Sequence, residues 1–266
     1  MGTDYTLRLS DFERMRFRMM AALALQKEGD LWEAAGIAKG ARVVDLGCGP
    51  GAVLLELARL VGPEGRVVGV DQDAEARSTA AAWAAEEGLD NVEVREGLAT
   101  DSGLPTGEWD AVMMRHVLIH NGPRVATILG HVRALLKPGG HVVLDETDAT
   151  CIRYERPLEP EIADMEDRYW QMLEGKGNDI GIGAHLPAHA EDAGFQVVER
   201  RGRFDHIPMV PTVRPPSWAG RQAVLDAGFC TADDIARWDA ALRRREQAGG
   251  GNHVVVPNFT VLARRP

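Results

Sequence analysis

The chain has 266 residues, 45% of them hydrophobic, which is enough for one sizeable core or for a core with a modest cap. Its net charge of −10 and isoelectric point near 5.3 argue against nucleic acid as a partner, because neutralising phosphates requires a basic face. The apolar runs are too short for a membrane span, and the charged N-terminal stretch lacks a signal-peptide pattern, so we expect a soluble cytoplasmic protein without a membrane partner.

The N-terminal stretch, residues 10–35, is predicted to be a helix. Ser10 and Glu13 have the spacing of a capping box. Apolar side chains then recur at helical spacing, at Phe12, Met15, Met19 and Leu23.

From Arg42 onward, short apolar strands alternate with helices. Strands are predicted at 42–47, 66–71, 92–97, 109–116 and 141–147, and helices at 52–62, 74–89 and 123–136. Pro-Gly-Gly in "LLKPGGHVVL" marks the turn between the last helix and the last strand. This alternation is typical of a parallel sheet that is covered on both faces.

After residue 148 the rhythm changes. An amphipathic helix is predicted at 159–174, and residues 186–201 should form a short helix and a sixth strand. A proline-rich loop should follow from Pro208, and then two helices, the second capped by Thr231 and Asp234. Because Pro257 cannot donate to a ladder, the firmly paired part of a seventh strand is placed after it, at 258–263.

The stretch from Val43 to Gly51, "VVDLGCGPG", carries glycines at every second position, Gly47, Gly49 and Gly51. They follow the end of the first core strand, where open α/β sheets bind their ligands. Residues without Cβ allow positive φ and close approach of a ligand, and one glycine would be enough for the turn alone. The formal match of "GCGPGA" to a dinucleotide pattern is weakened by Asp45 two residues earlier and by the long helical leader.

Four motifs in this order, "VVDLGCGPG", "VVGVD", "WDAVMMRHVLIH" and "LLKPGGHVVLDE", resemble those of class I S-adenosylmethionine (SAM)-dependent methyltransferases. The resemblance covers roughly residues 5–200 and includes the final strand. It implies SAM as the cofactor and S-adenosylhomocysteine as the product. The motifs are specific for the cofactor fold and not for the methyl acceptor.

With this resemblance, we expect an α/β fold with a Rossmann-like, doubly wound sheet of seven strands. The sheet should be mostly parallel with an antiparallel last strand, and N-terminal helices and a helical cap should complete the fold. The expected parts are an N-terminal helical lid at 1–40, a SAM-binding core at 41–149, a cap insertion at 150–195, and completion of the sheet at 196–266 with a second helical insertion at 205–253.

The resemblance also implies the cofactor contacts. Asp45 would accept from the SAM ammonium, directly or through water, and Asp71 would accept from both ribose hydroxyls or cap the following helix. Leu98 stands where the family often has an acid, so either Ala99 with Thr100 or Asp101 reads the adenine or that contact is missing. The expected cofactor-binding residues are Tyr5, Arg14, Asp45, Gly47, Cys48, Gly49, Gly51, Asp71, Gln72, Ala99, Thr100, Asp101 and Arg115.

Catalysis requires the acceptor to be held in line with the methyl group, and a base only if a proton must leave. His116 and His120 are spaced i, i+4, which predicts one helical face, and either is a candidate base or a residue that merely packs. Asp145 and Glu146 are candidates to hold an acceptor amine or a protonated histidine, or they form a solvated turn. Arg115 would meet a carboxylate or form a rim salt bridge.

No metal is expected. His116 with His120, and His185 with His189, share the HxxxH spacing, but a zinc site needs further ligands. Tyr5 and Arg14 are assigned to the lid over the cofactor, with a solvated basic stripe as the alternative.

The sequence therefore favours methyl transfer to O or N of a small organic acceptor, aromatic or from secondary metabolism. One alternative is a SAM-fold enzyme that catalyses a non-methylating cyclisation or rearrangement. Another is a nucleic-acid base methyltransferase, which the acidic balance and the absence of an Asn-Pro-Pro-Tyr-like motif oppose. A nicotinamide oxidoreductase is disfavoured by the motif set. The second insertion is expected to form a lid or a homodimer contact.

Overall fold

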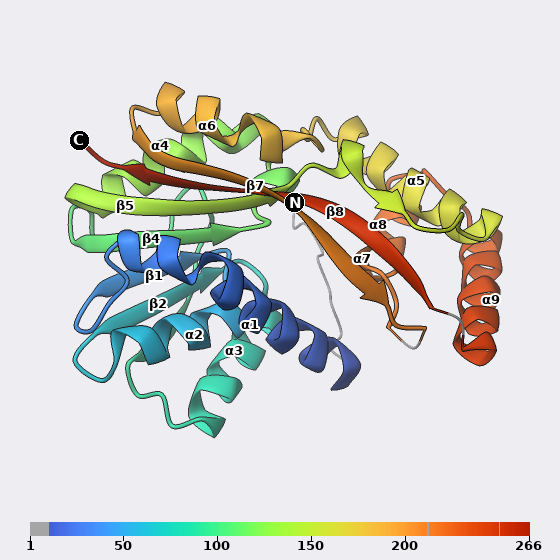
Figure 1. Cartoon of the computed structure of the whole chain (residues 1–266), viewed down its shortest axis with the longest axis horizontal. Coiled ribbons are helices and arrows are strands. Elements are labelled where there is room, and N and C mark those ends of the chain that lie inside the picture. The colour runs from blue at the N-terminus through green and yellow to red at the C-terminus, as the bar shows by residue number, and fades with distance from the viewer. Residues whose placement is uncertain (1–10, 212, 250) are drawn as a thin grey trace.

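The computed structural model describes residues 11–211, 213–249 and 251–266, with side chains from Met15 onward (Figure 1). Its centre is one mixed sheet. The strands follow the order β3 (Val92–Glu96), β2 (Arg66–Asp71), β1 (Arg42–Leu46), β4 (Trp109–Arg115), β5 (Leu136–Thr147), β8 (Asn252–Arg264) and β7 (Gln196–Met209). The first five are parallel, whereas β8 runs antiparallel to both β5 and β7.

This order confirms the predicted doubly wound sheet with an antiparallel last strand. A short strand that was not predicted, β6 (Arg153–Tyr154), pairs with β8 beyond the end of β5. The sheet therefore narrows from five parallel strands to a ribbon of β6, β8 and β7, which projects past the core (Figure 1).

Helices cover both faces of the sheet because successive side chains of a strand point to opposite faces. On one face, α1 (Asp11–Ala34), α2 (Ala52–Val61) and α3 (Ala74–Glu86) pack with Val43 and Met113. On the other face, α4 (Val125–Leu135) and α6 (Ile182–Asp192) pack with Val44 and Met114. All four of these strand side chains are fully buried.

The cap is built around a separate small core. It consists of α5 (Pro160–Gly175), α7 (Pro216–Ala219), α8 (Arg221–Asp226) and α9 (Ala232–Ala248). The stripe predicted from residues 159–174 is buried there, and Trp238 is 1% exposed with its indole N–H donating to Asp164 at 2.9 Å. Thr231 and Asp234 form the predicted capping box of α9. The division into lid, core and cap at the stated boundaries remains a proposal.

Two predictions about prolines were wrong. β7 continues through Pro208, and β8 is paired from Asn252 onward, on both sides of Pro257. Pro208 is tolerated because β7 is an edge strand, where a missing N–H interrupts no second ladder. Pro257 lies where β5 ends, and its carbonyl still accepts from the Asp148 N–H at 3.0 Å.

The start of β5 also differs from the prediction. The strand begins at Leu136, and Pro-Gly-Gly forms a bulge inside it, with Gly139 at φ 81°. The three cysteines, Cys48, Cys151 and Cys230, are free, as predicted. None of the described helices is long and apolar enough to cross a membrane.

We expect Trp238→Ala to destabilise the cap selectively, because the indole fills the small core that the cap helices share. The loss should be about 3–5 kcal/mol within that unit. Hydrogen exchange should speed up in α5 and α9, while β1 and β4 keep their protection. An equal loss of protection in the central strands would show that the cap has no core of its own.

Candidate functional site

The glycine loop joins β1 to α2 at the carboxyl edge of the sheet. Gly47, Gly49 and Gly51 all have positive φ, at 80°, 52° and 86°. A Cβ on Gly47 would stand 2.5 Å from Val117, and one on Gly51 would stand 2.7 Å from Ala80. A Cβ on Gly49 would meet nothing within 4 Å. Gly47 and Gly51 therefore permit close packing against Val117 and Ala80, whereas Gly49 of the same loop borders open space.

Cys48 points into the protein beneath this loop. Its side chain is buried, and burial raises the pKa of the thiol well above its usual value. The Gly47 and Cys48 N–H groups both donate to the Val70 carbonyl, at 2.8 and 3.1 Å. The predicted contact of Cys48 with a cofactor would therefore have to come from its backbone.

Asp45 is the penultimate residue of β1, two positions before Gly47, and is 3% exposed. Its Oδ2 atom is buried and has no hydrogen-bond partner in the described structure. Burial, and next the charge of Asp71, raise its pKa to about 7, against the pull of Arg115. A buried, unpaired carboxylate oxygen is costly, so an external cationic donor would fit this position.

Asp71 ends β2 and binds the glycine loop. One carboxylate oxygen accepts from the Gly49 N–H at 2.8 Å, and the other accepts from the Asp73 N–H at 2.9 Å. The alternative role as a helix cap belongs instead to Asp73, whose side chain accepts from the Ala76 N–H at 2.7 Å. Each Asp71 oxygen keeps a lone pair for a further donor such as a hydroxyl. The neighbouring Gln72 is exposed.

The segment after β3 forms a tight turn. Leu98 and Asp101 exchange backbone hydrogen bonds of 2.9 and 3.0 Å, which places Ala99 and Thr100 at the tip. The Asp101 carboxylate accepts from the Gly103 N–H at 3.1 Å and thus stabilises its own turn. Leu98 is 46% exposed, so this edge of the site presents an apolar side chain where an acid was expected.

The backbone reverses sharply at the end of β4. His116 has φ 53° and is the only described residue other than glycine with a positive φ. Its N–H donates to the Asp145 carbonyl at 2.9 Å, and a 3-10 turn, η1 (Leu118–His120), follows. The predicted helical face for His116 and His120 is therefore wrong, because the chain between them is not α-helical. Strained backbone of this kind is frequent at functional sites.

Glu146 anchors this turn from β5. It is 1% exposed, and its carboxylate accepts from the N–H groups of Val117, Leu118 and Ile119 at 2.8, 2.6 and 3.4 Å. Burial raises its pKa to about 8, while these three donors act in the opposite direction. Through these hydrogen bonds, Glu146 holds the backbone between His116 and His120 in place.

Asp145 belongs to a closed ring of four alternating charges. Its oxygens meet Arg115 at 3.1 Å and Arg203 of β7 at 3.3 Å, and both guanidinium groups also pair with Glu28 of α1. Burial opposes its charge, but Arg115, His116 and Arg203 outweigh that effect and lower its pKa. The guanidinium of Arg115 is therefore engaged inside the protein, and its predicted role toward a cofactor stays a prediction.

Sequence reasoning missed Glu28 and Arg203. A signal existed for the first, because Glu28 occupies a helical position between the buried Ala24 and Leu31. An acid on a buried stripe needs a cationic partner. No such signal identified Arg203 as that partner.

His116 lies beside this ring, with Nε2 3.7 Å from Asp145 Oδ1 and a side chain that is 33% exposed. Burial lowers its pKa to about 4, so the imidazole is neutral at neutral pH. His120 is exposed at the surface. Partial removal of its imidazole from water, and next the nearby His116, lower its pKa as well. Within the described residues, no three His, Cys, Asp or Glu side chains are grouped to hold a metal ion.

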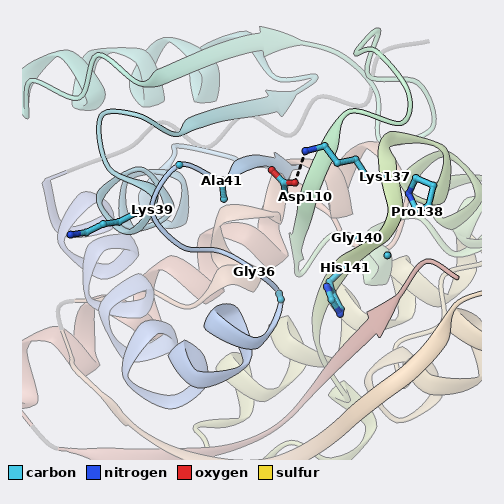
Figure 2. A pocket seen from close by; sticks show the side chains of 11 residues that line it. Gly36, Lys39, Ala41, Asp110, Lys137, Pro138, Gly140 and His141 are labelled. Carbon is cyan, nitrogen blue, oxygen red and sulfur yellow. Dashed lines mark hydrogen bonds and ion pairs between the residues drawn. The ribbon is translucent and has the colours of Figure 1, made fainter.

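The remaining predicted residues fall outside this geometry. Tyr5 lies outside the described residues, and of Arg14 only the backbone within α1 is described. A pocket of about 500 Å³ occupies the opposite, amino edge of the sheet, where Lys137 pairs with Asp110 at 2.6 Å beside His141 (Figure 2). That pocket is separated from the glycine loop by the length of the strands.

Comparisons with known proteins point to one family. Residues 37–199 match the family described as methyltransferase domain. A demethylmenaquinone methyltransferase from Lactococcus lactis subsp. lactis is 34% identical over 143 residues, which cover 52% of this chain and 54% of that protein. Nocamycin O-methyltransferase from Saccharothrix syringae is 41% identical over 107 residues, which cover 40% of this chain and 37% of that protein.

A solved structure shows the same fold over nearly the whole chain. A candidate methyltransferase from Bacillus halodurans C-125 has a TM-score of 0.59 and 19% sequence identity, and the match covers 90% of this chain and 98% of that one. Against the two curated relatives, by contrast, the chain spans about half of their length or less.

Gly51 and Gly49 should respond differently to substitution by alanine. We expect Gly51→Ala to lower the free energy of unfolding by about 2–4 kcal/mol, from backbone strain and the clash with Ala80. Gly49→Ala should cost only about 1 kcal/mol of stability but weaken SAM binding at least about tenfold, because its Cβ would enter the open space. Chemical denaturation and calorimetric titration measure both effects. Equal binding losses after correction for folding would contradict this division.

SAM affinity should depend on the ionisation of Asp45. Its pKa is raised to about 7, so the carboxylate is mostly protonated at pH 6.0 and mostly charged at pH 7.5. A charged carboxylate binds an ammonium, so affinity should rise by up to about tenfold between these pH values. Asp45→Asn should bind more weakly and without this dependence. Wild-type affinity that stays constant across the range would remove Asp45 from the ammonium site.

Proposed function

Because the chain belongs to the methyltransferase-domain family of class I SAM-dependent methyltransferases, we propose that it transfers a methyl group to O or N of a small organic acceptor. SAM is the cofactor of this family, and when bound it supplies a methyl group on a positively charged sulfur. The observation that carries the proposal is the unpaired, buried Asp45 oxygen in the strand that leads into the glycine loop, where Gly49 leaves open space.

The chain's own residues suit the parts of SAM. Asp45 would hold the ammonium, the backbone at Gly49 would admit the amino-acid end, and Asp71 would hold the ribose hydroxyls with its remaining lone pairs. Leu98 and the turn tip at Ala99 would border the adenine with apolar surface and backbone.

His116 is the favoured base. It lies at the carboxyl end of β4, is neutral at neutral pH, and has one ring nitrogen near an ionised Asp145. A neutral imidazole can take a proton from an acceptor hydroxyl or amine, and the adjacent carboxylate stabilises the imidazolium that forms. His120 is the second candidate, whereas Asp145 acts through His116 and Glu146 through the backbone of η1.

The nature of the acceptor is inferred from the net charge, the exposed apolar surface of α1 and the similarity to known methyltransferases. The acidic net charge disfavours nucleic acid. Met15, Met19 and Leu23 leave apolar surface exposed on α1, the helix whose Glu28 pairs with Arg115. The similarity to an O-methyltransferase supports oxygen as the methylated atom. We propose an aromatic or secondary-metabolite acceptor.

The test uses labelled SAM and a cell extract, with mass detection of products heavier by one methyl group. His116→Ala should reduce turnover by about 100-fold or more while SAM binding is kept. His185→Ala is the matched control, because this exposed histidine pairs only with Asp179 in the described structure. Thermal stabilisation of the protein by NAD but not by SAM would refute the proposal. A product of unchanged mass would indicate a rearrangement instead of methyl transfer.

A further inference from the structure

We propose that Glu28 and Arg203 are positioning residues for the methyl-transfer site, which fix the Asp145 carboxylate against His116 and thereby select the imidazole nitrogen that carries the proton. This inference rests on the proposed role of His116. It concerns two residues that lie far from the cofactor motifs, one on the N-terminal helix and one on the edge strand.

The first support is the closure of the ring. Arg203 meets Glu28 at 2.7 Å and Asp145 at 3.3 Å, and Arg115 meets Asp145 at 3.1 Å and pairs with the second oxygen of Glu28. Each carboxylate thus bridges both guanidinium groups. The Glu28 and Asp145 side chains are 0% exposed. Arg203 Nε also donates to Asp205 at 2.9 Å. Because loss of a partner would leave a buried charge poorly compensated, these contacts hold the Asp145 carboxylate in place.

The second support is that Asp145 holds His116 in two ways. Its carbonyl accepts from the His116 N–H at 2.9 Å, and its Oδ1 lies 3.7 Å from Nε2 of the same residue. The backbone of His116, at φ 53°, cannot relax while this bond and the Glu146 contacts to η1 persist. The ring therefore sets the position of the carboxylate relative to a histidine whose own backbone is fixed.

The chemical consequence follows from the imidazole. A neutral histidine carries its proton on one nitrogen only, and the choice depends on the partner that each nitrogen faces. The charged groups facing His116 are Asp145 on β5, Arg115 on β4 and Arg203 on β7, with His120 nearby on η1. Of these groups, only Asp145 is an anion, and its Oδ1 lies 3.7 Å from Nε2, too far for a direct hydrogen bond. Its negative charge favours the proton on Nε2, so the lone pair that can take a proton from the acceptor is on Nδ1.

The experiment measures this tautomer directly. Protein labelled with ¹⁵N-histidine is studied by long-range ¹H–¹⁵N NMR at pH 7.5, without SAM or acceptor, and His116→Gln assigns the signal. We expect the Nε2–H form to predominate in the wild type. Glu28→Gln and Arg203→Gln should lower the ratio of Nε2–H to Nδ1–H by at least about threefold. Arg203→Lys should lower it too, because a single amine cannot replace the guanidinium fork.

Matched controls exist on the same two elements. Arg201 of β7 pairs with Asp30 of α1 at 2.8 Å, but this pair is exposed and does not contact Asp145. Asp30→Asn and Arg201→Gln therefore remove the same charges from the same helix and strand, and should leave the tautomer ratio unchanged. Thermal unfolding of all variants separates loss of packing from loss of positioning.

Three outcomes would overturn the inference. The first is a wild type with no excess of the Nε2–H form. The second is a tautomer ratio that stays the same in Glu28→Gln and Arg203→Lys while Asp145→Asn changes it. The third is a change of this ratio in the Asp30 and Arg201 controls as large as that in the Glu28 and Arg203 variants. Failure of the proposed function is distinguishable. If His116→Ala retains full turnover, His116 is not the base, whatever the tautomer measurements give.

Discussion

The burial of carboxylate charge at the carboxyl edge of the sheet is the constraint on which this site depends. A carboxylate removed from water has to be met by cations or N–H groups. Asp145 is met by two arginines and Glu146 by three backbone N–H groups. Asp145 Oδ1 and Asp45 Oδ2 are both buried without a hydrogen-bond partner, but Asp145 Oδ1 pairs with Arg115 at 3.1 Å, whereas Asp45 has no ion pair among the described residues. Asp145 and Glu146 therefore stabilise the local structure. Asp45 is the acid that a positively charged group of a ligand would pair with.

Much of the fold followed from local signals in the sequence. Apolar runs of strand length, the glycine after α2 and the capping box at Thr231 each depend on neighbouring residues, and the structure confirms them. The lengths of β7 and β8 could not be predicted from neighbouring residues in the sequence. Pro208 and Pro257 are compatible with strands only because of where each strand lies in the sheet and which neighbour ends beside it.

In the candidate site, too, the features that depend on neighbouring residues were predictable, and those that depend on the assembled sheet were not. The glycine loop after β1 was predicted correctly, because alternating glycines at a strand end leave a clear pattern. The contact of Asp71 with the Gly49 N–H was not predicted, and its expected role toward the ribose stays a prediction. The relation of His116 to His120 was misjudged, since their spacing alone says nothing about a backbone that reverses at the first of them. The pairing of Glu28 with Arg203 joins residues brought together only by the completed sheet.

The position of β8 has a consequence for how the polypeptide is assembled on the ribosome. In the described structure, β7 pairs with no strand other than β8, which is synthesised later and must insert between β5 and β7. Until then both edges of β7 are open to wrong partners. Charged side chains along the emerging strand, among them Glu199, Arg200 and Arg201, would discourage association with other nascent chains during that interval.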